Sequence, residues 1–256
     1  MIDIHCHILP GVDDGSDSLE TSVEMAKLAW EQGTDLIVAT PHCCRPDQDG
    51  LITPALFAQR LGMLRRALRE AECPLKLAAG MEVFSTPALP DLLDRHLLLT
   101  LGGTRYFLLE FAFDERHSFM EACLQTVVDH GLHPVVAHPE RYHAVQRDPA
   151  IAAAWFRRGF LLQVNKGSIL GRLGAGAEET GWWLLKRGLA HAVASDAHRV
   201  TYRSPSLSHV RDVLGEALSW EYTKLLLETN PRRILKNQTI VSVEDFLRDG
   251  KKEHSR

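Results

Sequence analysis

Short apolar stretches alternate with longer amphipathic segments along nearly the whole chain. The short stretches have the length of buried strands, whereas the longer segments repeat apolar residues at the spacing of a helix face, as Leu19, Val23 and Ala26 do. Strands and helices that alternate with short connections predict a parallel sheet covered by helices. Seven strands with no position at which their order would reverse favour a closed α/β barrel over an open sheet.

The expected elements can be placed by residue number. After a strand at the N-terminus, further strands are expected over residues 35–40, 75–79, 106–109, 134–137, 160–164 and 191–194. The first helix is expected to begin at a capping pair formed by Asp17 and Glu20 and to end at Gly33. Later helices are expected over 54–72, 87–93, 115–130, 148–158, 177–187, 206–218 and 220–228, with one more beginning at 229–231. The glycine-rich stretch 171–176 is expected to be a loop.

The composition is that of a globular protein and excludes several functional classes. Of the 256 residues 45% are hydrophobic and 24% are charged, and the net charge is −4 with acidic and basic residues interspersed. This pattern offers no basic surface for a nucleic acid. No apolar run reaches the roughly 18 residues that span a bilayer and no signal peptide is evident, so we expect a cytoplasmic protein that does not insert into membranes. Five cysteines without framework spacing agree with a reducing compartment.

The chain shows no domain boundary and no low-complexity tract. We expect a single barrel over residues 1–240, followed by the end of a helix and a charged tail over 241–256. The last seven residues of this tail are expected to be disordered.

The C-terminal ends of the expected strands carry nine side chains of types that bind metals. In barrels of parallel strands, chemistry takes place at this end. His5 and His7 are two residues apart on a strand, so they face the same side, and Cys6 between them should point away. Each of the nine taken alone could have a structural role, as a surface residue or a turn residue. Chance is a poor explanation for the placement of all nine at the same end of the barrel. The nine are His5, His7, Asp14, His42, Glu82, Glu110, His138, Asp196 and His198.

This set predicts two or three divalent metal ions. Nine ligands exceed the needs of one ion, because catalytic zinc commonly uses three protein ligands and a water. Carboxylates suit harder ions such as Mn²⁺, whereas imidazoles suit Zn²⁺ and Fe. We expect Mn²⁺, with Zn, Fe, Co or Mg as alternatives. Cations would also relieve the repulsion among crowded carboxylates. Cys43 and Cys44 are interpreted as bystanders, because adjacent side chains seldom converge on one ion.

The residues around these side chains form recognisable motifs. They are His5-x-His7, Asp13-Asp14-Gly15, Thr40-Pro41-His42, Glu110-Phe111, His138-Pro139-Glu140-Arg141 and Ser195-Asp196-Ala197-His198. Together they resemble the polymerase-and-histidinol-phosphatase (PHP) superfamily. Within it, the chain is similar to the bacterial manganese-dependent protein-tyrosine phosphatases of capsule and exopolysaccharide gene clusters, from Met1 to about Gln238. The resemblance implies a distorted (β/α)7 TIM-like barrel, the PHP fold.

The resemblance also implies roles for individual residues. One metal would be held by His5, His7, Glu82 and Asp196; Glu82 would bridge it to a second, completed by Glu110 and His138; and a third would be held by Asp14, His42 and His198. Arg141 and Arg203 match positions that hold the phosphate in the family. The chain departs from the family in Cys43-Cys44-Arg45 after His42, where relatives often carry further histidine or arginine residues. The Cys-x5-Arg loop of cysteine-based tyrosine phosphatases is absent.

The implied function is hydrolysis of phosphotyrosine on a protein. A water activated by the metals would attack phosphorus in line without a covalent intermediate, and Arg141 would stabilise the charge of the transition state. The family implies that the substrate is the tyrosine-rich tail of a membrane-associated bacterial tyrosine kinase.

Other functions stay open on the sequence alone. The same metals would serve a small-molecule phosphatase such as a histidinol-phosphatase, from which only the substrate distinguishes a protein phosphatase. A metal-binding regulatory module without turnover would be expected to have lost some of the ligands. A proofreading nuclease would need an attached polymerase and a basic groove, and the sequence has neither.

Overall fold

Parallel strands form the centre of the molecule. The structure is a computed structural model that describes residues 1–46, 51–243 and 246, so the predicted disordered tail lies outside the described residues. Every strand pairing within this part of the chain is parallel. The strands are β1 (Ile2–Cys6), β2 (Leu36–Ala39), β3 (His42–Cys43), β4 (Lys76–Ala79), β5 (Glu82–Phe84), β6 (Tyr106–Glu110), β7 (His133–Ala137), β8 (Leu161–Asn165) and β9 (Ala192–Ala194).

The strands form a distorted barrel made of two sheets. One sheet has the order β1-β2-β4 and the other has the order β3-β5-β6-β7-β8-β9. After two intervening residues β2 continues into β3, and β4 continues into β5 in the same way, so both segments pass from one sheet to the other. A parallel bridge between Cys6 and Ala197 joins the first strand to the segment after β9. The predicted α/β barrel of seven strands in sequence order is confirmed, with two of the seven bent.

The two bends have a local cause in the sequence. Pro41 between β2 and β3 has no backbone N–H to donate to a ladder, so a strand tends to break there. At the bend between β4 and β5, a Cβ on Gly80 would lie 2.9 Å from Cγ1 of Val38. Only glycine therefore lets the two bent segments approach each other this closely.

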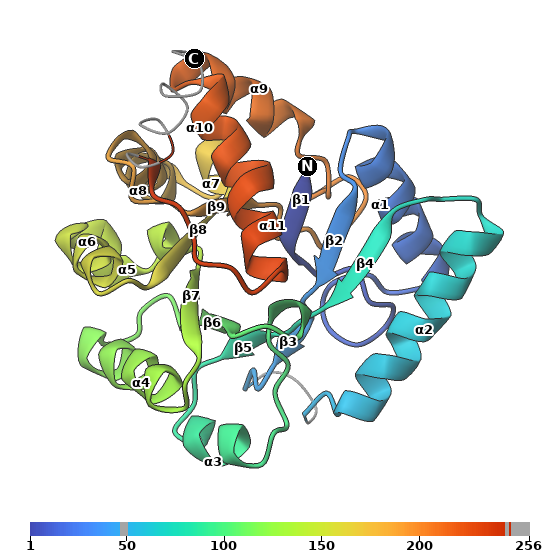
Figure 1. Ribbon diagram of the computed structural model, residues 1–256, viewed down its shortest axis with the longest axis horizontal. Helices are drawn as coiled ribbons and strands as arrows, with labels where there is room; N and C mark the ends of the chain where they lie inside the picture. Colours follow the sequence, from blue (N-terminus) through green and yellow to red (C-terminus); the bar gives the residue numbers. More distant parts are fainter. Residues whose placement is uncertain (47–50, 244–245, 247–256) are drawn as a thin grey trace.

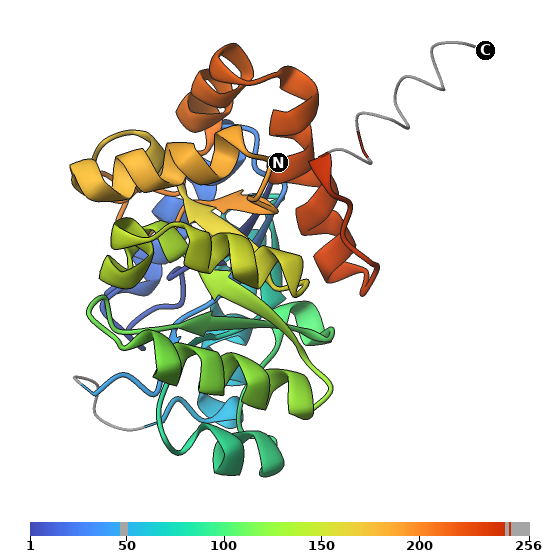
Figure 2. The ribbon, with the colours of Figure 1, turned by 90° about the vertical axis from the view of Figure 1, so that its left-hand side faces the viewer.

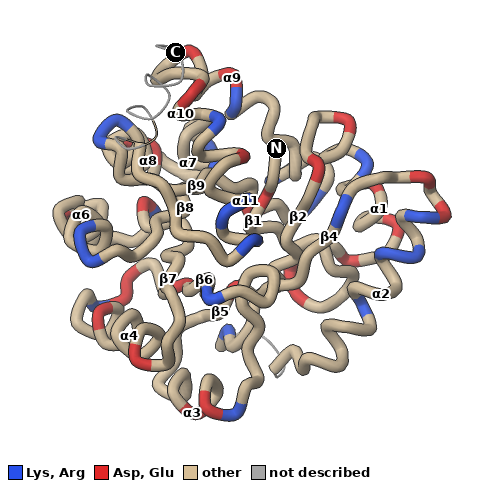
Figure 3. The backbone as a smooth tube through the Cα atoms, viewed as in Figure 1, with Lys and Arg blue, Asp and Glu red and all other residues tan. Residues whose placement is uncertain are grey.

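Helices surround the barrel in Figure 1, and both signs of charge are interspersed over them in Figure 3. No helix in the described ranges is both long and apolar enough to cross a membrane. The helices are α1 (Leu19–Glu31), α2 (Pro54–Glu70), α3 (Leu89–Asp94), α4 (His117–Asp129), α5 (His143–Arg147), α6 (Ala150–Arg157), α7 (Lys166–Ile169), α8 (Ala175–Lys186), α9 (Ser208–Ala217), α10 (Trp220–Lys224) and α11 (Asn230–Leu235). Two 3-10 turns, η1 (Leu101–Gly103) and η2 (Pro139–Arg141), and one π-helical turn, η3 (Leu225–Thr229), complete the elements.

The capping prediction for the first helix is wrong by one residue. Ser18 is the N-cap of α1, and its hydroxyl accepts a hydrogen bond from the backbone N–H of Thr21 at 3.1 Å. Asp17 instead accepts the side-chain hydroxyl of Thr21 at 2.8 Å. Both side chains can cap a helix, and the sequence alone did not separate two adjacent candidates.

Several other elements differ from the prediction. The four to five residues of α5 and α7 are too few to show an apolar period, so neither helix was predicted. The stretch 171–176 is not a loop throughout, because α8 begins at Ala175. The helix predicted over 220–228 is α-helical only to Lys224 and then widens into the π-helical turn.

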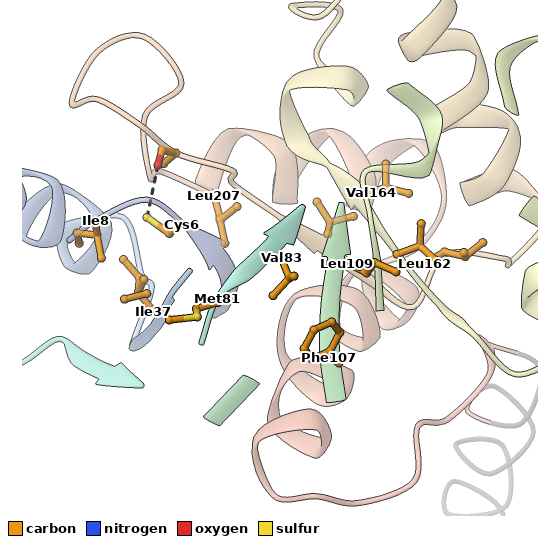
Figure 4. Close-up of a cluster of buried hydrophobic side chains, with 14 of the residues drawn as sticks. Cys6, Ile8, Ile37, Met81, Val83, Phe107, Leu109, Leu162, Val164 and Leu207 are labelled. Carbon is orange, nitrogen blue, oxygen red and sulfur yellow. Dashed lines mark hydrogen bonds between the residues drawn. The ribbon is translucent and has the colours of Figure 1, made fainter. Parts of the chain in front are cut away.

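Alternating side chains on the strands form two apolar clusters. The larger cluster lies between strands and helices, and Figure 4 shows part of it, including Phe107, Leu109 and Leu162. Cys6 belongs to this cluster with its sulfur 3.9 Å from the carbonyl oxygen of Ala197, so it points away from the neighbouring histidines as predicted.

The smaller cluster forms the floor of the barrel. It combines residues two apart on successive strands, such as Tyr106 and Leu108 on β6 and Ala192 and Ala194 on β9. Ile234 of α11 packs into this cluster from the end at which the strands begin, where α11 lies in Figure 2. Because side chains alternate along a strand, Glu110 continues the same face of β6 toward the opposite end. The barrel therefore has an apolar floor and a polar mouth.

Candidate metal centre

The structure brings all nine predicted metal-binding side chains together at the mouth of the barrel. Eight of them are at most 5% exposed, whereas the side chain of Asp14, on the loop after β1, is 58% exposed. The histidines and carboxylates come from β1, β3, β5 and β6 and from the segments after β1, β7 and β9.

Glu82 lies at the middle of this group. The parallel pairing of β3 with β5 places His42 opposite Glu82 in the register. Oε1 of Glu82 lies 3.1 Å from Nε2 of His5 and 3.0 Å from Nε2 of His138. Oε2 of Glu82 lies 3.2 Å from Nε2 of His7 and 2.8 Å from Nδ1 of His42. One buried carboxylate is thus surrounded by four imidazoles.

Asp196 contacts both the histidines and the predicted phosphate-binding arginines. Its Oδ1 lies 3.4 Å from Nε2 of His7 and 2.5 Å from a terminal nitrogen of Arg203. Its Oδ2 accepts hydrogen bonds from Arg141 at 3.3 Å and from the side-chain amide of Asn165 at 2.5 Å. With a φ of +49°, the backbone of Asp196 is in the left-handed region, a strained conformation that is often found at functional sites.

Asp14 and Glu110 complete the group at its outer edge. Asp14 Oδ1 lies 3.3 Å from Nε2 of His198 and 3.5 Å from Nε2 of His42. Oε2 of Glu110 lies 3.3 Å from Nδ1 of His42, and its Oε1 lies 3.7 Å from Nε2 of His138.

The hydrogen bonds of His5 and His7 fix which ring nitrogen carries the proton. Nδ1 of His5 is 2.8 Å from Oε1 of Gln163, and Nδ1 of His7 is 2.8 Å from Oδ2 of Asp13. Because both partners accept, each Nδ1 holds a proton, and Nε2 is the ring nitrogen left to bind a metal ion. The two Nε2 atoms are only 3.2 Å apart. Two lone pairs that face each other at this distance would repel, so a proton or a metal cation must lie at this position.

Buried polar atoms without hydrogen bonds also fit a metal centre. Such atoms are costly in a folded protein unless a partner satisfies them. Among the described residues, buried atoms at the mouth whose close contacts lack the geometry of a hydrogen bond include Nδ1 of His42, Oε2 of Glu82, Oε2 of Glu110, Nδ1 of His138 and Nε2 of His198. These donor types, imidazole and carboxylate, suit Mn²⁺, Fe or Zn.

Four sets of ligand atoms are compact enough to hold an ion, with all atoms of a set within 4.8 Å of one another. The sets are His7, Asp14, His42 and His198; His5, His7 and Asp196; His5, Glu82 and His138; and His42, Glu82 and Glu110. The trio implied for a third metal falls in one set, whereas Glu110 groups with His42 rather than with His138. No cysteine belongs to any of these sets. Which side chain holds which metal stays a prediction.

The electrostatics of the centre keep Glu82 ionised. Burial raises the pKa of Glu82, but the surrounding imidazoles, His5 and His42 foremost, outweigh burial and hold that pKa well below its usual value. Burial likewise lowers the pKa of His7, yet the Asp13 carboxylate raises it well above the usual value. For His198 burial prevails and lowers the pKa to about 4. Ionised carboxylates beside a neutral imidazole are the forms that bind metal ions.

Three supporting residues were missed by the sequence analysis. Asp13 orients His7, Gln163 orients His5 and Asn165 holds Asp196, as the distances above show. Asp13 is part of the Asp-Asp-Gly motif, so the sequence could have indicated that it belongs to the site. Gln163 and Asn165 lie two apart on β8, so they face the same side as the floor residue Leu161. Their amide side chains are weak metal ligands, and they were therefore not considered.

The metal-binding group opens into a cavity of about 210 Å³. Arg141 and Arg203, the two residues that the resemblance implied for phosphate binding, both lie on its wall. Arg45 lies there too, with a terminal nitrogen 3.0 Å from Nε2 of His42. Three guanidinium groups above a cage of histidines and carboxylates can bind an anion.

Comparison with known proteins identifies the family. The model of the family described as "Capsular polysaccharide synthesis, CpsB/CapC" matches residues 1–236. The chain belongs to the CpsB/CapC family. It is 34% identical over 242 residues to the tyrosine-protein phosphatase YwqE of Bacillus subtilis, covering 94% of this chain and 93% of YwqE. It is 30% identical over 247 residues to the tyrosine-protein phosphatase CpsB of Streptococcus pneumoniae, covering 94% of this chain and all of that protein.

A solved structure of the CpsB/CapC family shares the fold. It comes from work on YwqE of Bacillus subtilis and CpsB of Streptococcus pneumoniae, described as "unique metal-dependent tyrosine phosphatases". The TM-score is 0.88 at 33% identity, and the match covers 94% of this chain and 97% of the other. The predicted membership in this group of phosphatases is confirmed.

Proposed function

We propose that this chain is a metal-dependent tyrosine-protein phosphatase that acts in capsular polysaccharide synthesis. The names of its CpsB/CapC relatives supply the reaction. The observation in the chain itself that supports it most is the pair of facing Nε2 atoms of His5 and His7, beside the ionised carboxylate of Glu82. Such a cage is suited to cations and leaves an anion-binding cavity above it.

The nine side chains would hold two or three divalent ions, and Mn²⁺ is our choice. Four of the nine side chains are carboxylates that lie beside imidazoles, and Mn²⁺ accepts both kinds of ligand. Cations held in such a cage polarise a phosphoryl oxygen and lower the pKa of a water molecule.

Arg141 and Arg203 would bind the phosphate. Each contacts Asp196 from the cavity side, so each guanidinium is already directed at the place where cations and an anion would meet. Guanidinium groups match two phosphate oxygens at once and would stabilise the charge that spreads over the equatorial oxygens in the transition state.

The attacking group would be a water molecule. The described residues that line the cavity include no cysteine, serine or threonine, and its histidines and carboxylates are the proposed metal ligands. A phenolate is a good leaving group, so hydrolysis of phosphotyrosine needs little help from a general acid. We propose that the substrate is a phosphotyrosine protein in the cytoplasm, namely the tyrosine-rich tail of a membrane-associated tyrosine kinase.

A paired assay tests this function. Purified protein is chelated exhaustively and assayed on a phosphotyrosine peptide and on histidinol phosphate, before and after addition of Mn²⁺. Hydrolysis of the peptide should be lost on chelation and return with Mn²⁺. Full activity after chelation would contradict metal dependence, and faster hydrolysis of histidinol phosphate would favour a small-molecule phosphatase.

A pair of histidine variants tests the site. His138→Ala should abolish turnover because His138 faces Glu82 in the cage, whereas His130→Ala, at the exposed end of α4, should leave turnover unchanged. An unchanged rate in His138→Ala would remove His138 from the site. Circular dichroism checks that both variants are folded.

A further inference from the structure

The cavity at the mouth has one hydrocarbon wall. Among the described residues that line it, every side chain except that of Phe113 is charged or an imidazole. Phe113 is 40% exposed, although exposing an aromatic ring to water is unfavourable. The described lining residues are Asp14, His42, Arg45, Glu110, Phe113, His138, Arg141, Asp196 and Arg203.

The ring of Phe113 is held in place from several sides. Its backbone carbonyl accepts a hydrogen bond from the N–H of His143 at 2.7 Å, which ties the loop between β6 and α4 to the start of α5. The guanidinium carbon of Arg141 lies 4.4 Å from the ring centroid. The ring of His138 meets it edge to face, with centroids 6.3 Å apart. The ring is thus a positioned surface and not a loosely held side chain.

Arg141 connects this ring to the anion site. The same guanidinium that lies over Phe113 reaches Asp196 at 3.3 Å. A phosphate bound by Arg141 would therefore place its ester group close to Phe113. In an aryl phosphate the aromatic ring is separated from phosphorus by a single oxygen atom, so that ring would lie within contact distance of the hydrocarbon wall.

We propose that Phe113 selects aryl phosphates over alkyl phosphates by packing against the ring of the substrate. This inference rests on the proposed phosphatase function and adds to it the residue that recognises the tyrosine side chain. Aromatic pairs contribute about 0.5–1.5 kcal/mol beyond the area they bury, so the contact changes the preference by about two- to tenfold. An aliphatic residue at position 113 would lose this preference.

A purely structural role for Phe113 makes a different prediction. If the ring only held Arg141 in place, its loss would weaken binding of every phosphate to the same extent. The ratio of aryl to alkyl affinity separates the two roles, because only direct contact with the substrate changes that ratio.

Binding of two phosphonates measures this ratio without turnover. Phenylphosphonate and methylphosphonate carry the same anion and differ in the aryl group. Their dissociation constants are measured by isothermal titration calorimetry on the Mn²⁺-loaded full chain, for wild type, Phe113→Leu, Phe113→Tyr and the control Trp30→Leu. Trp30 on α1 is also 40% exposed but does not line the cavity.

We expect wild type, Phe113→Tyr and Trp30→Leu to bind phenylphosphonate more tightly, and Phe113→Leu to lose about two- to tenfold of this preference. Equal preference in Phe113→Leu and wild type would overturn the proposal, as would equal binding of both compounds by wild type. Failure of wild type to hydrolyse a phosphotyrosine peptide would instead contradict the proposed function, whatever the ratio. No binding of either phosphonate would contradict both.

Discussion

Asp13 is not a predicted metal ligand, but both of its carboxylate oxygens accept hydrogen bonds from residues at the metal centre. Oδ1 accepts the backbone N–H of Gly15 at 2.9 Å, and Oδ2 accepts Nδ1–H of His7 at 2.8 Å and the backbone N–H of His42 at 2.9 Å. Every partner is a donor, so only a group that accepts at both ends fits. The side chain thereby fixes the tautomer of His7 and the position of two predicted ligands.

Asp13→Asn should weaken metal binding by about 10–100-fold, the usual cost of losing such an orienting partner. One end of the amide would point an N–H₂ group at a donor, and an N–H₂ facing His7 would favour the tautomer with the proton on Nε2. The metal dependence of peptide hydrolysis should shift to higher Mn²⁺ concentration, and the dissociation constant for Mn²⁺ should rise.

Asp17→Asn is the matched control for this substitution. Asp17 lies on the same loop but is exposed, and it accepts only the hydroxyl of Thr21. Its Mn²⁺ dependence should equal that of wild type. If Asp13→Asn also keeps the affinity of wild type, the tautomer of His7 is not what Asp13 controls.

The sequence distinguished ligand types better than it distinguished their roles. Strand periodicity placed Glu110 and Asp196 at the mouth, because strand ends and residue types are both local properties. It named Asp14 as a ligand but did not indicate the supporting role of Asp13, which depends on how the loop folds back to Gly15. Nor did it indicate Phe113, whose role depends on a contact with Arg141 from another loop.

At the scale of elements, β8 and α7 contribute to the mouth without any predicted ligand. Lys166, the first residue of α7, is buried, and burial lowers the pKa of its ammonium group to about 8. The ammonium donates hydrogen bonds to the carbonyl oxygens of Ser204 and Ser206, the latter at 2.7 Å. These residues follow Arg203, so α7 anchors the loop that carries one of the proposed phosphate-binding arginines.

Lys166→Met should lower kcat/KM for the phosphotyrosine peptide by about tenfold. The variant loses charge-assisted hydrogen bonds worth about 1.5–3 kcal/mol each and leaves two carbonyls without their donor, so Arg203 loses its fixed position. The loss should appear mainly in KM, because the metal ligands stay in place. Lys76→Met, on the exposed start of β4, should behave as wild type. A normal KM in Lys166→Met would show that the loop keeps its shape without this anchor.

The order of elements was predictable, but the short and bent ones were not. Long helices such as α2 show their apolar period over several turns, as Phe57, Leu61, Leu64 and Leu68 do. A strand of two or three residues, such as β3 or β5, has no period to read. These two strands exist because the barrel bends at its mouth, and the bend depends on packing between distant segments, such as Gly80 against Val38.

At the scale of the whole molecule, the metal centre depends on closure of the entire barrel. Its side chains come from segments between residue 5 and residue 198, at the ends of β1, β3, β5, β6, β7 and β9. The metal centre can therefore form only under conditions in which the apolar floor at the opposite end of the barrel is folded. His191, just before β9 and at the other end of that strand from Asp196, is buried within this scaffold.

His191 should make the scaffold sensitive to acid. Its Nδ1 accepts the backbone N–H of Leu162 at 3.0 Å, and its ring stacks on Phe156 with centroids 4.9 Å apart. Burial, with a smaller contribution from His133, lowers the pKa of His191 from 6.5 to about 3. Below pH 6.5 the unfolded chain takes up a proton at this residue and the folded chain does not, so stability falls as the pH decreases toward 3.

Between pH 7 and pH 5 this residue alone should reduce the free energy of unfolding by about 2 kcal/mol. This magnitude requires only that the pKa of His191 in the folded protein lies below 5. His191→Asn is the matched variant, because the side-chain oxygen of asparagine can accept the same N–H and does not titrate. Denaturant unfolding of both Mn²⁺-loaded proteins should show their difference in stability shrinking by this amount as the pH falls, since acid release of metal affects both alike. Parallel pH profiles would mean that His191 is protonated in the folded barrel.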